Sequence, residues 1–262
     1  PLTESARGFG IRLGHLAESV IGAKNVTSLL RSTGKVTGTT LPKWNSHIPS
    51  PSNNPRVLLD PGVEKEYVYF PSCISRQLGT PKHNGNISLA ETLVIVAKRA
   101  GISLWLPEDT EGHCCGLPFH SKGYEQAYHL ALHKTLLQMW EWSGLGKYPI
   151  IIDTTSCTHS IRTCKEDLSA EAQELWKSLT FLDSIEFLHD ILLPQLDLHR
   201  LEEDVVLHPN CSARKLGLDS KLAAIASQCA RSATVPLTLG CCGFAGDRGM
   251  LFPELTASAT KK

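Results

Sequence analysis

The hydrophobic pattern divides the chain into helical and strand-like segments that alternate after residue 61. Apolar residues recur at helical spacing over residues 1–35. Short apolar runs that are typical of strands occur at Tyr67–Phe70, Ile102–Leu106 and Ile150–Ile152. Strands that alternate with helices predict an α/β fold, with a mainly parallel sheet covered by helices. The expected helices lie at residues 88–100, 122–142, 170–179 and 184–193.

The same pattern restarts in the second half of the chain. Strand-like runs at Asp204–Leu207 and Thr234–Leu239 flank a helical segment at Asp219–Ala230. The offset of about 130 residues predicts a tandem duplication and excludes a solenoid. We therefore expect two α/β units, at residues 61–200 and 201–262, of which the second is C-terminally incomplete. Residues 1–60 should form an N-terminal helical segment and an extended connector rich in Gly, Ser and Pro.

Composition narrows the function classes. The 262 residues are 42% hydrophobic, which is enough for a packed core, and 26 basic residues balance 26 acidic ones. A nucleic-acid partner is not expected without a basic excess. No apolar run reaches the ~20 residues that a membrane span needs, so no transmembrane segment is expected. Nine cysteines are an odd number, and the chain is long enough to fold without disulfides.

Cysteines occur twice in the same local context. Cys114–Gly116 and Cys241–Gly243 both read Cys-Cys-Gly, and each follows a lone cysteine at the end of a strand-like run. The carboxyl ends of parallel strands gather at one edge of a sheet, so these thiols should converge. Gly116 and Gly243 would let the backbone approach a ligand closely, and His208 could line the second site. The predicted ligands are Cys73, Cys114, Cys115 and Cys157 in the first half, and Cys211, Cys241 and Cys242 in the second.

The spacing of the cysteines bears on the kind of site. Zinc knuckles of the Cys-x2-4-Cys type and ferredoxin-type Cys-x2-Cys steps are both absent from the sequence. Widely separated thiols with an adjacent pair favour an iron–sulfur assembly over a single zinc ion. Two alternatives stay open. One is a structural or subunit-docking module with zinc or empty cysteine sites, and the other is a metal-free redox domain that uses the vicinal thiols.

Several other residues have simpler interpretations. Cys229 lies in a helical stretch and should be a buried small hydrophobe. His113 and His120 flank the first cysteine pair, where loop histidines are common without being ligands. Asp153 and Asp247 should cap turns or helices.

The cysteine motifs resemble those of the cysteine-rich domain called the CCG domain. That domain occurs in a subunit of heterodisulfide reductases, in glycolate oxidase iron–sulfur subunits and at the C-terminus of cytochrome-type, FAD-linked D-lactate dehydrogenases. The likeness to the last group lies in Asp153–Cys157, His208–Ser212 and Cys241–Ala259, within a resemblance over roughly residues 60–262. One departure is that Cys157 lacks the Cys-x2-Cys ending of heterodisulfide reductases, and Cys164 follows instead.

The resemblance implies a function for the whole chain. It implies an iron–sulfur cluster, of the 4Fe-4S type, in the C-terminal module of an enzyme whose FAD and ferredoxin-like domains lie outside this sequence. A quinone or cytochrome would accept the electrons. No catalytic residue is identified in this chain, which we expect to be inactive alone. A cytoplasmic location is expected, with peripheral attachment to the inner membrane as an option. Cluster occupancy should favour the first site, which has four cysteines.

Overall fold

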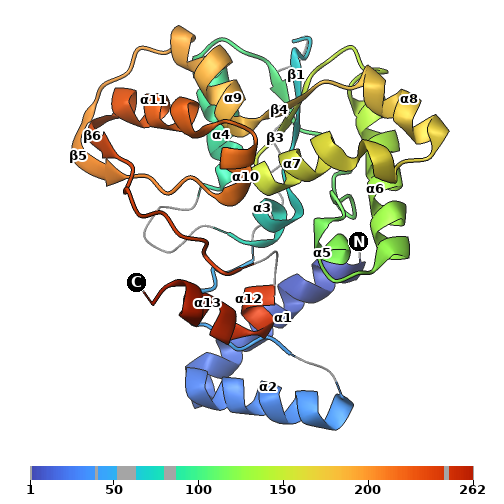
Figure 1. Ribbon diagram of the computed structural model, residues 1–262, viewed down its shortest axis with the longest axis vertical. Coiled ribbons are helices and arrows are strands. Elements are labelled where there is room, and N and C mark those ends of the chain that lie inside the picture. The colour runs from blue at the N-terminus through green and yellow to red at the C-terminus, as the bar shows by residue number, and fades with distance from the viewer. Residues whose placement is uncertain (1, 39–40, 52–62, 80–86, 245–247, 262) are drawn as a thin grey trace. The chain divides into compact units, whose positions relative to one another are not determined.

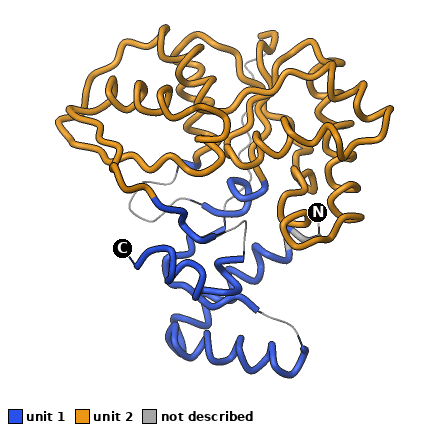
Figure 2. Tube along the Cα trace, in the orientation of Figure 1, with its two compact units in different colours: residues 1–54, 73–88, 240–262 blue, residues 55–72, 89–239 orange. Residues whose placement is uncertain are grey.

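A computed structural model describes residues 2–38, 41–51, 63–79, 87–244 and 248–261 (Figure 1). The chain divides into two compact units (Figure 2). Unit 1 consists of residues 1–54, 73–88 and 240–262, and unit 2 consists of residues 55–72 and 89–239. The domain boundaries that we place at residues 60 and 200 stay predictions.

The centre of unit 2 is a parallel sheet. Its four strands are β1 (Tyr67–Phe70), β2 (Leu104–Trp105), β3 (Ile150–Ile152) and β4 (Phe181–Asp183), in the order β2-β1-β3-β4. All three strand pairs are parallel, which confirms the predicted α/β class. The sequence pattern did not predict β4, because its three residues separate two helical segments and are too few to show a period.

The strands carry two hydrophobic cores, one on each face of the sheet. Phe70 belongs to a buried cluster with α6 (Glu125–Trp142) and α7 (Thr155–Thr163). Tyr69 belongs to a second buried cluster with α4 (Leu89–Arg99). Successive side chains of a strand point to opposite faces, so β1 contributes to both cores. The strand ends are thereby fixed between two helical layers.

The helix α6 buries a different face from the expected one. The helical spacing of residues 122–142 predicts that Tyr124, Leu130 and Leu137 face inward, but these three side chains are exposed. Apolar residues occur all around this helix, so its sequence is compatible with more than one buried face. The prediction was therefore wrong by about a third of a turn. The residues that α6 buries are Tyr128, Leu132, Thr135, Leu136, Met139 and Trp142.

The second half of the chain forms a smaller sheet. Its strands β5 (Leu201–Val206) and β6 (Ala230–Thr234) are parallel. The predicted strand at Thr234–Leu239 was wrong, since β6 ends at Thr234. Pro236 has no N–H to donate to a ladder, which accounts for the earlier end. Most residues of β5 are exposed, in contrast to the fully buried β3.

Unit 1 begins with two helices instead of the single expected segment. α1 (Leu2–Ile21) and α2 (Ala23–Thr37) are separated by Gly22, which has a positive φ of 79°. The sequence predicts that Trp44 docks the connector onto the main body of the chain. In the structure Trp44 packs on α1, where its indole N–H donates to Glu18 Oε2 at 2.9 Å.

The remaining elements are short. No helix in the described part of the chain is both long and apolar enough to cross a membrane. The other α-helices are α3 (Cys73–Gln77), α5 (Leu117–His120), α8 (Ala170–Ser178), α9 (Ser184–Glu186), α10 (Cys211–Lys215), α11 (Asp219–Cys229), α12 (Arg248–Leu251) and α13 (Pro253–Ala259). The π-helix is η2 (Phe187–Leu192), and the 3-10 helices are η1 (Cys164–Asp167) and η3 (Leu193–Gln195).

Candidate functional site

Every first-half cysteine of the motif follows the carboxyl end of a strand. Cys73 is the first residue of α3, directly after β1. Cys114 and Cys115 lie between β2 and α5. Cys157 lies in the first turn of α7, directly after β3. This placement agrees with the expected position of ligands in an open parallel sheet.

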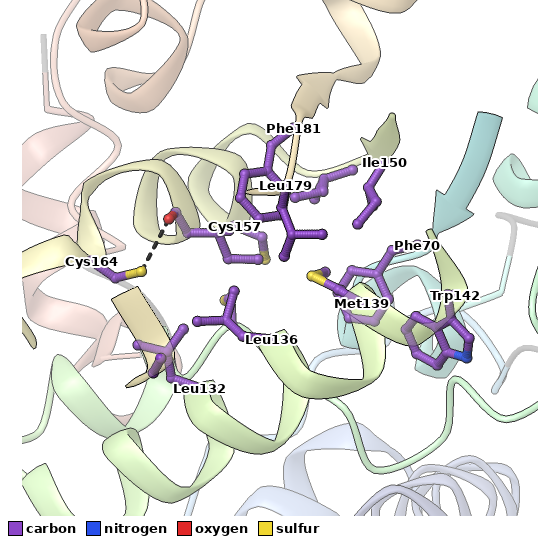
Figure 3. Close-up of a cluster of buried hydrophobic side chains, with 14 of the residues drawn as sticks. Phe70, Leu132, Leu136, Met139, Trp142, Ile150, Cys157, Cys164, Leu179 and Phe181 are labelled. Carbon is purple, nitrogen blue, oxygen red and sulfur yellow. Dashed lines mark hydrogen bonds between the residues drawn. The ribbon is translucent and has the colours of Figure 1, made fainter. Parts of the chain in front are cut away.

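Three of these thiols share one core cluster within unit 2, in which Cys115 and Cys157 are buried members and Cys114 packs against them. Figure 3 shows Cys157 among Leu136, Leu179 and neighbouring side chains. The thiols of Cys114 and Cys157 both shift the pKa of the Cys115 thiol. The Cys114 thiol lowers the pKa of Cys115, but the Cys157 thiol and burial together raise this pKa well above its usual value. Cys115 is therefore a neutral thiol in this arrangement.

The donor chemistry of this trio fits a metal that prefers sulfur, but the arrangement is not yet a coordination sphere. In the part of the chain that the structure describes, no three Cys, His, Asp or Glu side chains are placed to hold a metal ion. Binding would require the thiols to deprotonate and reorient. Cys73 belongs to unit 1, so its convergence with the trio stays a prediction.

The backbone of the first Cys-Cys-Gly is held in place by α6. Gly116 has a φ of 80°, and a Cβ at this position would lie 2.5 Å from Cδ2 of Tyr128. The backbone N–H of Cys114 donates to Oγ1 of Thr135 at 2.9 Å, and the same hydroxyl donates to the Cys114 carbonyl at 3.0 Å. Thr135 is fully buried and carried no signal in the sequence, because it lies inside an apolar helix. The glycine was predicted to allow close approach, and here it approaches an aromatic ring.

Asp153 ties together the two strand ends that precede Cys73 and α7. Its carboxylate accepts hydrogen bonds from the Tyr69 hydroxyl and from the Ser72 backbone N–H, both at 2.8 Å. The hydroxyls of Ser72 and Thr154 are 2.7 Å apart and share a further hydrogen bond. Burial and the neighbouring Asp153 charge raise the pKa of Tyr69, so its hydroxyl stays a donor. Asp153 is therefore a cross-strand latch, where a turn or helix cap was expected.

Two further residues near Cys114, Cys115 and Cys157 are buried and packed within the fold. The Cys164 thiol donates to the carbonyl of Ile161 at 3.1 Å, as the dashed line in Figure 3 shows. Burial raises the pKa of Cys164 to about 12. His113 is buried, and its ring lies edge-on to Trp142 with 5.2 Å between centroids. His120, by contrast, is exposed.

The second Cys-Cys-Gly has the same backbone form in a more open setting. Gly243 has a φ of 71°, and a Cβ here would lie 2.6 Å from the carbonyl oxygen of Leu255. The Gly243 N–H donates to the sulfur of Cys241 at 3.4 Å. Both Cys241 and Cys242 are exposed. The two motif copies thus share a left-handed glycine but differ in the burial of their thiols.

The other second-half residues are placed as follows. Cys211 is the first residue of α10 and is exposed, in the position that Cys73 has in α3. His208 is exposed, directly after the end of β5. Cys229, expected to be buried, is partly exposed at the end of α11. Asp247 lies outside the described residues. Since Cys211 belongs to unit 2 and the Cys241–Cys242 pair to unit 1, their convergence also stays a prediction.

Comparison with known proteins identifies the first half of this arrangement. Residues 67–162 match the family described as CCG, a cysteine-rich domain. The matched range runs from the first residue of β1 into α7 and so includes the first four cysteines of the motif. Searches of the curated proteins and of the solved structures gave no match. The chain therefore contains, at residues 67–162, a CCG cysteine-rich domain.

Proposed function

We propose that this chain is the iron–sulfur electron-transfer module of an FAD-dependent dehydrogenase that acts on D-lactate or another 2-hydroxy acid. The observation that carries the proposal is the gathering of Cys114, Cys115 and Cys157 in and against one core cluster of a cysteine-rich domain. A cysteine-rich domain with gathered thiols is suited to metal or redox chemistry. The sequence resemblance supports the finer assignment.

The ligands for a first cluster would be Cys73, Cys114, Cys115 and Cys157. A 4Fe-4S cluster is held by four cysteine thiolates and would supply one-electron transfer. The chain's own contribution is an apolar, nearly dry environment for two of the ligands, because Cys115 and Cys157 are buried among apolar side chains. Burial and hydrogen bonds to sulfur are two means by which proteins set the reduction potential of such clusters.

The second set of cysteines would form a weaker or vacant site. Cys211, Cys241 and Cys242 are only three ligands, and all three are exposed. A partner that holds FAD would oxidise the substrate, a ferredoxin-like domain would relay electrons, and a quinone or cytochrome would accept them. In this proposal the 262-residue chain has no dehydrogenase activity of its own.

Anaerobic reconstitution of the chain with iron and sulfide tests the proposal. We expect about four iron and four labile sulfide ions per chain, with a broad visible absorbance band that dithionite bleaches. Cys115→Ser should abolish the band, and Cys229→Ser, which removes a cysteine outside the motifs, should leave it unchanged. Both variants need the same far-UV circular dichroism as the parent chain.

The alternative functions give different results in the same experiment. Stoichiometric zinc that survives in air, with no bound sulfide, would favour a docking module. A chain with no metal at all, in which a dithiol-selective arsenical blocks the vicinal pair, would favour metal-free thiol redox chemistry. Either result would contradict the iron–sulfur assignment.

A further inference from the structure

One face of α1 exposes an apolar ridge. Phe9, Leu13, Leu16 and Val20 are spaced by four, three and four residues, so they lie along one side of the helix. Each is between 53% and 75% exposed. The opposite side is covered by the chain itself, since a Cβ on Gly14 would lie 2.0 Å from the Trp44 ring. An apolar row this exposed marks an interaction surface.

The N-terminal segment that carries this ridge has a net positive charge. The first 59 residues contain seven basic and two acidic residues, although the whole chain is neutral. Both acids are engaged, because Glu4 pairs with Arg76 at 2.5 Å and Glu18 accepts from Trp44 at 2.9 Å. Between Glu18 and Asp60 the sequence contains no acidic residue at all. The N-terminal helices therefore carry an uncompensated positive charge.

Some of this charge lines a hollow beside α2. The hollow has a volume of about 390 Å³, and no acidic side chain is among the described residues that line it. Arg31 and Lys35 are four residues apart on α2, where like charges repel. Lys43 and the Thr27 side chain complete the polar lining, and Leu30 lies beside them. Within the described residues these three cations have no ion-pair partner, so an anion would relieve their repulsion.

We propose that α1, α2 and this hollow form a docking surface for an anionic phospholipid bilayer. The ridge would enter the headgroup boundary, and the hollow would hold a lipid phosphate. Apolar residues on one face with basic residues around them are typical of helices that lie on membranes. A bilayer accepts a convex ridge without needing a matching groove, whereas a protein partner would have to supply one. Basic residues near an anionic surface add to the attraction.

Vesicle flotation of the intact chain tests this proposal. At low salt we expect at least tenfold tighter binding to vesicles of equal parts phosphatidylglycerol and phosphatidylcholine than to phosphatidylcholine alone, with the difference lost at high salt. The double change Leu13→Glu and Leu16→Glu should weaken binding at least tenfold. Its control is Leu130→Glu, which alters a leucine on α6 that is even more exposed. Lys35→Gln should weaken binding about fivefold, and Lys134→Gln, also exposed, should not.

Several outcomes would overturn the proposal. Equal binding to both vesicle types, or unchanged binding by the double variant, would show that the ridge does not bind a membrane. Stabilisation by inorganic pyrophosphate without vesicle binding would assign the hollow to a free phosphate compound. A dimer in light scattering that the double variant dissociates would assign the ridge to a second copy of the chain. None of these results depends on iron or sulfide, so the proposed electron-transfer function is tested separately.

Discussion

The two halves of the chain carry the same cysteine motif in different surroundings. In the first half Cys115 and Cys157 are buried in one core cluster against a four-stranded sheet. In the second half Cys211, Cys241 and Cys242 are exposed, and the sheet has two strands. The motif thus fixes the local backbone in both halves, while burial of the thiols depends on the helices that pack around them.

The two motif glycines, Gly116 and Gly243, likewise share a backbone conformation but pack against different neighbours. Gly116 and Gly243 both have a positive φ, and both are too close to a neighbour to accept a Cβ. The neighbour is Tyr128 of the long helix α6 in the first case and the backbone of Leu255 in the short helix α13 in the second. A longer helix buries more apolar surface, so it gives the first site its solvent exclusion.

The largest expected difference is in thiol reactivity. Iodoacetamide should label Cys211, Cys241 and Cys242 about a thousandfold faster than Cys164, because the last is buried and a pKa of about 12 leaves little thiolate at neutral pH. The labelling rate of Cys164 should keep increasing up to about pH 12. Peptide mass spectrometry over time measures each rate.

Labelling in denaturant provides the control for this prediction. All nine cysteines should then react at similar rates, since burial is lost. If native Cys164 were labelled as rapidly as Cys211, the first half would not be a packed core.

Core substitutions should affect the first half next most strongly. Leu136 is fully buried beside the thiol trio, so Leu136→Ala should lower the free energy of unfolding by about 3 kcal/mol. Leu237 is fully exposed, so Leu237→Ala should change the free energy of unfolding by less than about 0.5 kcal/mol. Urea unfolding followed by circular dichroism measures both. Equal effects would contradict the contrast in packing between the halves.

Substitution of Gly116, the glycine of the first motif, should lower the free energy of unfolding by a smaller amount. Gly116→Ala would force a Cβ against Tyr128 and into left-handed backbone, which should cost about 2 to 3 kcal/mol of unfolding free energy. Gly123 also has a positive φ but has open space around it, so Gly123→Ala should cost about 1 kcal/mol. Thermal melts of the two variants separate crowding from backbone strain. A melt of the Gly116 variant above that of the Gly123 variant would argue against the close contact.

The smallest effect should come from the strand-end latch. Asp153→Asn keeps the shape but weakens two hydrogen bonds at 2.8 Å, so it should cost about 1 to 2 kcal/mol of unfolding free energy. Asp167→Asn is the control, because Asp167 is exposed and accepts one bond from Tyr128. We expect that control to cost about 0.5 kcal/mol. Chemical unfolding measures the free energy of unfolding of both variants. An Asp153 variant as stable as the parent chain would show that Asp153 does not stabilise the strand ends.

The sequence was sufficient for the parts of the fold with strong local patterns. The apolar runs at Tyr67–Phe70 and Ile150–Ile152 are strands with the predicted bounds. The buried face of α6 was predicted wrongly because apolar residues surround that helix and only tertiary packing chooses among them. β6 has the sequence Ala-Arg-Ser-Ala-Thr, which is too polar to stand out as a strand.

The candidate site was partly predictable for a similar reason. Cysteine spacing after strand runs predicted which thiols gather, and Cys114, Cys115 and Cys157 lie in or against one core cluster. The supporting residues Thr135 and Asp153 act through contacts with residues 21 to 84 positions away. A single sequence does not encode such pairings in any local pattern, so they required the structure.

The central claim is that the first set of cysteines holds an iron–sulfur cluster and the second set does so weakly or not at all. Anaerobic reconstitution of Cys115→Ser and Cys242→Ser chains, followed by iron and labile-sulfide analysis, tests it most directly. The account predicts that Cys115→Ser loses nearly all bound iron and sulfide, while Cys242→Ser retains most of both. Equal retention by the two variants, or a greater loss from Cys242→Ser, would contradict it.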